Sequence, residues 1–153
     1  MQTLKLLCKN LQDSDVRWIL AGSLSLALQG VDVEPNDIDI ITDSQGAFRI
    51  NEILKKYEKK KVEYSEIGRI SSYFGIFEMQ GVKVEVMGDY RERQRTKWIN
   101  LSKRLENPNI IEIDGTRVLV SRLEDQLASY RTMARPKDVE KARKISQKLN
   151  PLS

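Results

Sequence analysis

The sequence predicts a mixed α/β (α+β) fold, and three observations indicate this class. Residues 16–20 form a short apolar run, followed by Gly22-Ser23 and a second apolar stretch, which is typical of a strand, a turn and a helix. Residues 37–41 alternate polar and apolar side chains, as a strand does. Residues 123–149 repeat apolar side chains at helical spacing. Strand and helix signals interleaved in this way predict a sheet packed by helices.

The length of 153 residues suits one compact domain. We expect a single domain over residues 1–153, with its core at about 16–120 and closing helices at about 121–149. Apolar residues make up 40% and charged residues 31%, which is ordinary for a folded domain. No apolar stretch reaches the ~20 residues of a membrane-spanning helix. The N-terminus lacks the features of a secretory signal, so we expect a cytoplasmic protein without membrane contact.

Apolar residues at helical spacing predict five helices. Ser23 can cap the second helix and Gly30 can stop it, while Pro136 separates the last two. The third predicted helix ends in Lys59-Lys60-Lys61, which is either a solvated helix end or a nucleic-acid contact. The predicted helices are residues 2–13, 23–28, 47–61, 123–133 and 139–149.

Shorter apolar runs predict six strands. Gln80-Gly81 and Asp114-Gly115 each separate two of these runs, so both pairs are expected to form antiparallel hairpins. The predicted strands are residues 16–20, 37–41, 73–79, 82–87, 110–113 and 117–120.

The composition excludes several kinds of chemistry. The chain has no histidine, so Ser-His-Asp and Cys-His catalysis and His-ligated zinc are excluded. The one cysteine, Cys8, cannot form an internal disulfide and is expected in the core. Lys and Arg outnumber Asp and Glu by 26 to 22, and this net charge of +4 permits phosphate-bearing partners. Carboxylate and lysine chemistry remains.

Three carboxylates form the first candidate site. Asp37 and Asp39 are two residues apart in a predicted strand, so both side chains leave the same face. Glu85 occupies the equivalent alternation in residues 82–87 and can join them across the sheet. Oxygen ligands of this kind suit Mg²⁺ or Mn²⁺ in phosphoryl transfer. The alternative is that these residues are solvated at the ends or exposed faces of their strands.

Gly22-Ser23 forms the second candidate site. It lies between a predicted strand and a predicted helix, where free backbone N–H groups and the helix dipole favour a phosphate and the serine hydroxyl adds a donor. An ordinary turn with an N-cap would have the same two residues.

Together these residues resemble the signature of the DNA polymerase β-type nucleotidyltransferase superfamily. The resemblance rests on Gly22-Ser23, thirteen intervening residues, Asp37-Ile38-Asp39 and the later Val84-Glu85-Val86. The tail is similar to the last helices of toxin-type and antibiotic-modifying members, through residues 121–127 and Arg135-Pro136-Lys137-Asp138. The match spans about residues 16–145.

The resemblance implies a nucleotidyltransferase fold with a mixed sheet and helices on one side. It implies that the catalytic carboxylates Asp37, Asp39 and Glu85 bind two Mg²⁺ ions. Glu85 would hold the ion nearer the acceptor and could accept the proton of the acceptor hydroxyl. Gly22 and Ser23 would contact the β- and γ-phosphates of an NTP. The products would be an NMP ester of an unknown hydroxyl acceptor, whether a small molecule, a protein or an RNA end, and pyrophosphate.

The sequence departs from that pattern before Asp37. Active members often carry a basic residue and a Ser or Thr there, whereas this chain has Val33-Glu34-Pro35-Asn36, and Asp32 and Glu34 add negative charge. By resemblance Lys137 would bind the nucleotide; the alternative is an ion pair with Asp138 or Glu140 on a solvated helix.

Two other functions compete with Mg²⁺-dependent nucleotidyl transfer. One is a catalytically weak, nucleotidyltransferase-like binding protein with a protein partner, as in a toxin–antitoxin complex. The other is RNA binding by basic residues of the closing helices. Those residues are Arg131, Arg135, Lys141, Arg143, Lys144 and Lys148.

Overall fold

The structure is a computed structural model that describes residues 2–151. Met1 and residues 152–153 of the expected domain lie outside the described residues. The helices are α1 (Gln2–Leu11), α2 (Gly22–Leu28), α3 (Ser44–Ile53), α4 (Leu123–Met133) and α5 (Pro136–Leu149), with 3₁₀ turns η1 (Lys55–Tyr57) and η2 (Ser102–Leu105). The strands are β1 (Trp18–Ala21), β2 (Ile38–Thr42), β3 (Glu58–Ile67), β4 (Ile70–Met79), β5 (Val82–Gln94), β6 (Lys97–Asn100), β7 (Asn109–Ile113) and β8 (Thr116–Val120).

Within the described residues the strands form one eight-stranded mixed sheet. Its order is β3-β4-β5-β2-β1-β8-β7, with β6 paired to β5 outside this path. The central pair β1 and β2 is antiparallel, whereas β2 runs parallel to β5 and β1 runs parallel to β8. The predicted mixed α/β class is therefore confirmed.

Alternation along the central strands gives the sheet two different faces. Ile38 and Ile40 of β2 point into the main core, where α1 contributes Leu7 and α3 contributes Ile50. Cys8 is also buried there, as predicted. The opposite face carries a smaller apolar cluster and the polar residues described below. Burial of one face thus leaves the polar side chains of the central strands on the other face.

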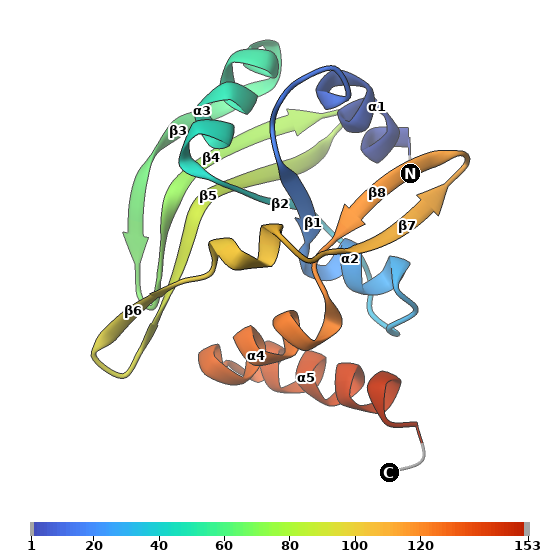
Figure 1. Ribbon diagram of the computed structural model, residues 1–153, viewed down its shortest axis with the longest axis vertical. Helices are drawn as coiled ribbons and strands as arrows, with labels where there is room; N and C mark the ends of the chain where they lie inside the picture. The colour runs from blue at the N-terminus through green and yellow to red at the C-terminus, as the bar shows by residue number, and fades with distance from the viewer. Residues whose placement is uncertain (1, 152–153) are drawn as a thin grey trace.

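The closing helices pack on α2 and not on the main core. Leu26 of α2 and Ile145 of α5 are fully buried in a separate cluster with Leu123 of α4. In Figure 1, α4 and α5 lie side by side next to α2, on the far side of the molecule from α1 and α3. This packing places α4 and α5 over the polar face of the sheet at its β1–β2 centre.

Both predicted hairpins are confirmed, and their turns explain them. Gln80-Gly81 joins β4 to β5, and Asp114-Gly115 joins β7 to β8. All four turn residues have positive φ angles, which suits the twist of antiparallel strands and favours glycine at the second position.

The third predicted helix is wrong beyond residue 53. The helix ends at Ile53, and Lys59–Lys61 lie in β3, an edge strand of the sheet. The side chain of Asn51 accepts a hydrogen bond from the Val62 backbone N–H and donates one to Glu58, so it holds the start of β3 against α3. Exposed lysines on an edge strand discourage pairing with other chains.

Strands β3 and β6 are absent from the sequence prediction because their polar composition hides the alternation. Only Val62 is fully buried in the burial pattern of β3, and β6 has no buried residue. Pairing with β4 and with the extended end of β5 supplies the order that the local pattern lacks.

Among the described residues, no helix combines the length and apolar character that crossing a membrane requires.

Candidate active site

The three predicted carboxylates come together on the polar face of the sheet. In the parallel pair β2 and β5, Asp39 lies directly opposite Glu85. Asp37 precedes β2 by one residue and shares the face of Asp39, since Ile38 between them is buried in the core. All three line one cleft of about 490 Å³. The register of two strands therefore assembles the group that the spacing predicted.

Gly22 and Ser23 lie beside these carboxylates, because β1 pairs with β2. Ala21 is the register partner of Asp39, so the turn that follows β1 reaches the same cleft. Gly22 has a φ angle of +71°, and a β-carbon there would overlap the Asp39 carboxylate. A glycine is thus required both for the backbone conformation and for the close approach of Asp39.

Ser23 does not cap α2, contrary to the prediction. The helix begins one residue earlier, at Gly22, and has no side-chain cap. The Ser23 hydroxyl oxygen instead accepts a hydrogen bond from the Asn36 backbone N–H, at 3.2 Å. This contact ties the Gly-Ser turn to the connection that leads into Asp37. The extra acids of that connection, Asp32 and Glu34, do not line the cleft.

Gln126 of α4 is a site residue that sequence reasoning missed. Its side-chain oxygen accepts a hydrogen bond from the Gly22 backbone N–H at 3.0 Å, across 104 residues of sequence. Its amide nitrogen donates to the Ser25 hydroxyl at 2.8 Å and to the Ser121 carbonyl at 3.2 Å. The buried Gln126 amide therefore holds the Gly22-Ser23 turn in a fixed position relative to α4. A lone glutamine within an amphipathic helix has no local feature that would reveal this contact.

The environment of Asp39 favours its protonated form. Burial, together with the nearby charges of Glu85 and Asp37, raises the pKa of Asp39 to about 7. Lys83, two residues before Glu85 on β5, places its ammonium 3.0 Å from Glu85 and 3.5 Å from Asp37. The hydrogen bond to Glu85 raises the pKa of Lys83. Lys83 was not among the predicted site residues, since a lysine alternating with valines reads as an exposed strand position.

The donor set fits a divalent ion. Hard carboxylate oxygens are what Mg²⁺ and Mn²⁺ prefer, and the raised pKa of Asp39 marks a place that is short of positive charge. Within residues 2–151, no group of three acidic side chains is already placed to hold a metal ion. Lys83 contacts two of the three carboxylates of the cleft, those of Asp37 and Glu85. Asp37, Asp39 and Glu85 are the acidic residues among which the ligands of such an ion would be found.

The closing helices contribute cations to the opposite wall of the cleft. Asp138 is fully buried and accepts hydrogen bonds from the Arg135 side chain at 2.6 and 3.2 Å, while Glu140 pairs with Arg143. Both alternative partners of Lys137 are thus engaged elsewhere, and Lys137 lines the cleft. Lys141, which the sequence suggested only for RNA binding, lines it as well and lies over the Tyr130 ring.

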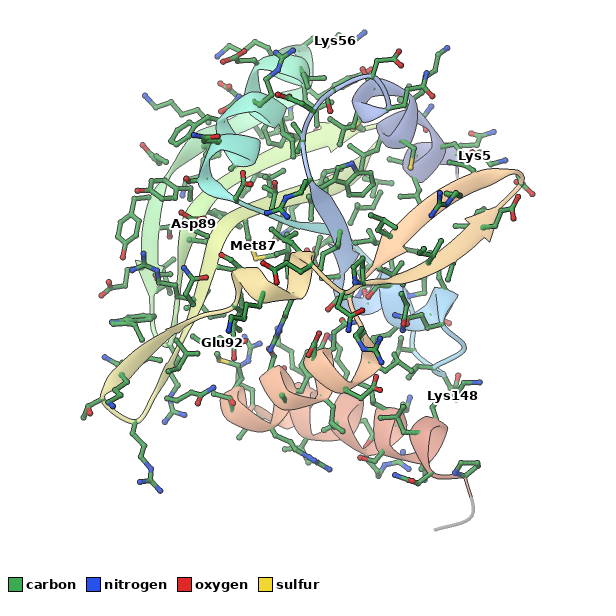
Figure 2. All side chains as sticks on the ribbon, in the orientation of Figure 1. Lys5, Lys56, Met87, Asp89, Glu92 and Lys148 are labelled. Carbon is green, nitrogen blue, oxygen red and sulfur yellow. The ribbon has the colours of Figure 1, made fainter. Side chains whose placement is uncertain are left out.

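The far end of the cleft is largely apolar and depends on a bulge in β5. Strict alternation would put Tyr90 on the core face with Val86, but Asp89 has a φ angle of +51° and the β4–β5 register shifts there. The Asp89 carboxylate accepts a hydrogen bond from the Ser44 backbone N–H at 3.0 Å, which anchors the bulge to α3. Met87 and Asp89, labelled in Figure 2, mark this part of β5.

The bulge turns Tyr90 into the cleft, where its hydroxyl donates to the buried Glu92 at 2.7 Å. Burial raises the pKa of Tyr90, so its hydroxyl stays protonated as a donor. Arg104 of η2 completes this wall and donates to the Ser129 hydroxyl at 2.7 Å. Ile70, Met87 and Tyr130 line the same region.

A mixed sheet with a Gly-Ser turn and three carboxylates at its centre, closed by two C-terminal helices, defines a protein of the nucleotidyltransferase fold class. The family model of the aminoglycoside-2″-adenylyltransferases matches residues 3–145. The chain therefore belongs to this family of nucleotidyltransferases.

Solved structures agree with that fold. A candidate nucleotidyltransferase of Thermotoga maritima is 37% identical, with a TM-score of 0.83 over 98% of this chain and 92% of its own. The lincosamide antibiotic adenylyltransferase LnuA, bound to lincomycin, is 12% identical with a TM-score of 0.62, covering 95% of each chain. ANT(2″)-Ia, in complex with adenylyl-2″-tobramycin, is 14% identical with a TM-score of 0.60 over 98% of this chain and 90% of its own. Curated proteins yield no significant match.

Proposed function

We propose that the protein transfers an NMP group from an NTP to a hydroxyl of an acceptor in an Mg²⁺-dependent reaction. The observation that carries this proposal is the register of β2 and β5, which sets Asp39 opposite Glu85 with Asp37 beside them, next to the Gly22 turn. A fold has no structural need for three carboxylates in one cleft, since they repel one another. Phosphoryl transfer does need such a group, because carboxylates hold the divalent ion that the reaction uses.

Asp37 and Asp39 are the proposed metal ligands, and Glu85 lies on their far side along the sheet. The bound ion supplies positive charge that offsets the charge developing on the phosphates. The acceptor oxygen attacks the α-phosphorus and forms the new P–O bond, while the bond to the β-phosphate oxygen breaks and pyrophosphate leaves. Glu85 takes the proton of the acceptor hydroxyl, so that mass and charge balance.

The proposed nucleotide contacts come from two sides of the cleft. The Ser23 hydroxyl keeps its proton for a phosphate oxygen, because its oxygen accepts from Asn36. The Gly22 N–H is already bound to Gln126, so Gly22 acts through its lack of a side chain and not through its own amide. Lys137 and Lys141 face the phosphates from α5, as cations that no described carboxylate pairs with.

The experiment is to incubate the protein with each of the four α-³²P-labelled NTPs, Mg²⁺ and a cell extract, and to search for a labelled macromolecule or metabolite. Asp39→Asn is the matched control, because it keeps the side-chain size and removes one ligand charge. We expect Mg²⁺-dependent labelling by wild type only. Tight binding of Mg²⁺ and NTP with no label in any fraction would instead favour the binding protein with a protein partner. Failure to bind any NTP would overturn the proposal.

A further inference from the structure

The ammonium group of Lys83 lies between two carboxylates that belong to neighbouring strands. Lys83 shares the cleft face of β5 with Glu85, and its Nζ is 3.0 Å from Glu85 Oε1 and 3.5 Å from Asp37 Oδ2. It therefore spans the gap between β5 and the connection that leads into β2. A cation that bridges two carboxylates in this way has the position and the charge of a metal ion.

The other cations of the cleft are held differently. Arg135 is bound to the buried Asp138, and Arg104 to the Ser129 hydroxyl. Lys141 lies over the Tyr130 ring, and Lys137 has no carboxylate partner among the described residues. Within residues 2–151, Lys83 is thus the cation in direct contact with the catalytic carboxylates.

The contact with Lys83 changes how many positive charges the three carboxylates still need from metal ions. The three carboxylates carry three negative charges when ionised, and Lys83 offsets one of them without any ligand. The two that remain match a single divalent ion. A second divalent ion between Asp37 and Glu85 would have to displace the ammonium and break both ion pairs.

We propose that Lys83 is a resident cation of the active site, which takes the place of the acceptor-side divalent ion, so that the enzyme binds one Mg²⁺ with its nucleotide and not two. The inference rests on the proposed function and specifies how its site is charged. Asp37 and Asp39 would then hold the ion that arrives with the NTP, while the ion pair with Lys83 orients Glu85 toward the acceptor. The two-ion arrangement implied by the sequence resemblance is replaced by one ion and one ammonium.

The test is the stoichiometry of Mn²⁺ binding in the presence of saturating α,β-methylene-ATP, measured by electron paramagnetic resonance and by calorimetry. We expect one tightly bound Mn²⁺ in wild type and two in Lys83→Met, with the second ion bound at least tenfold more tightly than in wild type. Arg104→Met is the matched control, because it removes one positive charge from the same cleft, while the hydrogen bond that it breaks goes to Ser129 and not to a carboxylate. It should still bind one ion.

Two tightly bound ions in wild type would overturn the inference, as would an equal gain in Arg104→Met. A Lys83→Met protein that binds one ion as wild type does would also overturn it. Lys83→Gln and thermal unfolding of each variant separate these results from misfolding, and the wild-type stoichiometry decides even if both variants fail to fold. If none of the folded proteins binds Mn²⁺ together with the nucleotide analogue, the proposed function itself fails, which is a different result from two ions in wild type.

Discussion

At the level of single residues, Asp39 is the carboxylate of the site whose pKa is changed by burial and by the charges of the other two. It is half-buried, opposite Glu85 and two residues from Asp37, and desolvation together with the charges of these two neighbours raises its pKa to about 7. An aspartate in an unfolded chain has a pKa of about 3.9. Between these two values the folded protein binds more protons than the unfolded chain. The free energy of unfolding must therefore fall as the pH rises from about 4 to about 7.

The first prediction concerns Asp39→Asn in metal-free protein. Urea unfolding in EDTA at pH 5 to 8 should show wild type losing stability relative to the variant as pH rises, by about 1–3 kcal/mol in total, since one pKa unit corresponds to about 1.4 kcal/mol. At pH 8 the variant should be at least as stable as wild type. With Mg²⁺ and NTP added, only wild type should gain stability. A variant that is clearly less stable at pH 8, yet gains as much from the ligands, would contradict this account.

Gly22 supports a second prediction, because its positive φ and its contact with Asp39 are separate constraints. Gly22→Ala should lower stability by about 1–3 kcal/mol and weaken NTP binding at least tenfold, since the new β-carbon displaces the Asp39 carboxylate. Gly68→Ala is the control, with a φ of +60° and open space around its β-carbon position. It should show the backbone cost alone. Equal effects of the two substitutions on NTP binding would refute the role of the contact.

Between elements, the decisive contact joins α4 to the turn between β1 and α2. Gln126 accepts from the Gly22 N–H and donates to Ser25 and Ser121, so one side chain links α4 and the segment just before it to an α2 segment about 100 residues away in sequence. Gln29 belongs to the same hydrogen-bonded region, since it donates to the Ser121 carbonyl at 2.9 Å, but it does not touch Gly22. Substituting each glutamine in turn therefore distinguishes a loss of stability in this region from a specific loss of the contact with the Gly22 turn.

We predict that Gln126→Leu and Gln29→Leu each destabilise the protein by about 1–3 kcal/mol, because each removes side-chain hydrogen bonds to α2 and to the Ser121 carbonyl. Only Gln126→Leu should also raise the Kd for NTP, since only it frees the Gly22 backbone. Calorimetric titration of both variants at a temperature well below their unfolding midpoints measures this difference. A similar loss of NTP affinity in Gln29→Leu would show that the effect is general loosening of the region.

For the molecule as a whole, the distribution of charge bears on the acceptor. The chain carries a net charge of +4, and the cleft contains Lys83, Arg104, Lys137 and Lys141. Apart from Asp37, Asp39 and Glu85, the one acidic residue lining the cleft in residues 2–151 is Asp138, which is bound to Arg135. A polycationic acceptor would find no free carboxylate here, although the family takes its description from aminoglycosides.

We therefore expect tobramycin to be a poor acceptor. Pyrophosphate release with ATP, Mg²⁺ and tobramycin should not exceed the rate measured without an acceptor. Arg104→Ala should leave that result unchanged, because the missing acidic groups and not one repulsive arginine are the cause. Turnover of tobramycin by wild type at a kcat/KM of about 10⁴ M⁻¹s⁻¹ or more, the range of ordinary enzymes, would disprove this reading of the cleft.

Structural features that depend only on residues close together in the chain could be predicted from the sequence. The alternation at residues 37–41 places Asp37 and Asp39 on one face whatever the rest of the chain does, and Asp114-Gly115 specifies its own turn. The same holds for the glycine after β1 and for the two closing helices, whose observed bounds lie close to the predicted ones. Period-two and helical patterns are local, so local sequence is enough to reveal them.

Features that depend on partners far along the chain required the tertiary structure. The lysines at 59–61 belong to a strand because β4 is available to pair with them, and Tyr90 enters the cleft because a bulge at Asp89 reverses the alternation of β5. Gln126 and Lys83 gain their roles only when α4 and β5 are brought to Gly22 and Asp37. A hydrogen bond or an ion pair acts over about 3 Å, and only the folded chain decides which distant groups come that close.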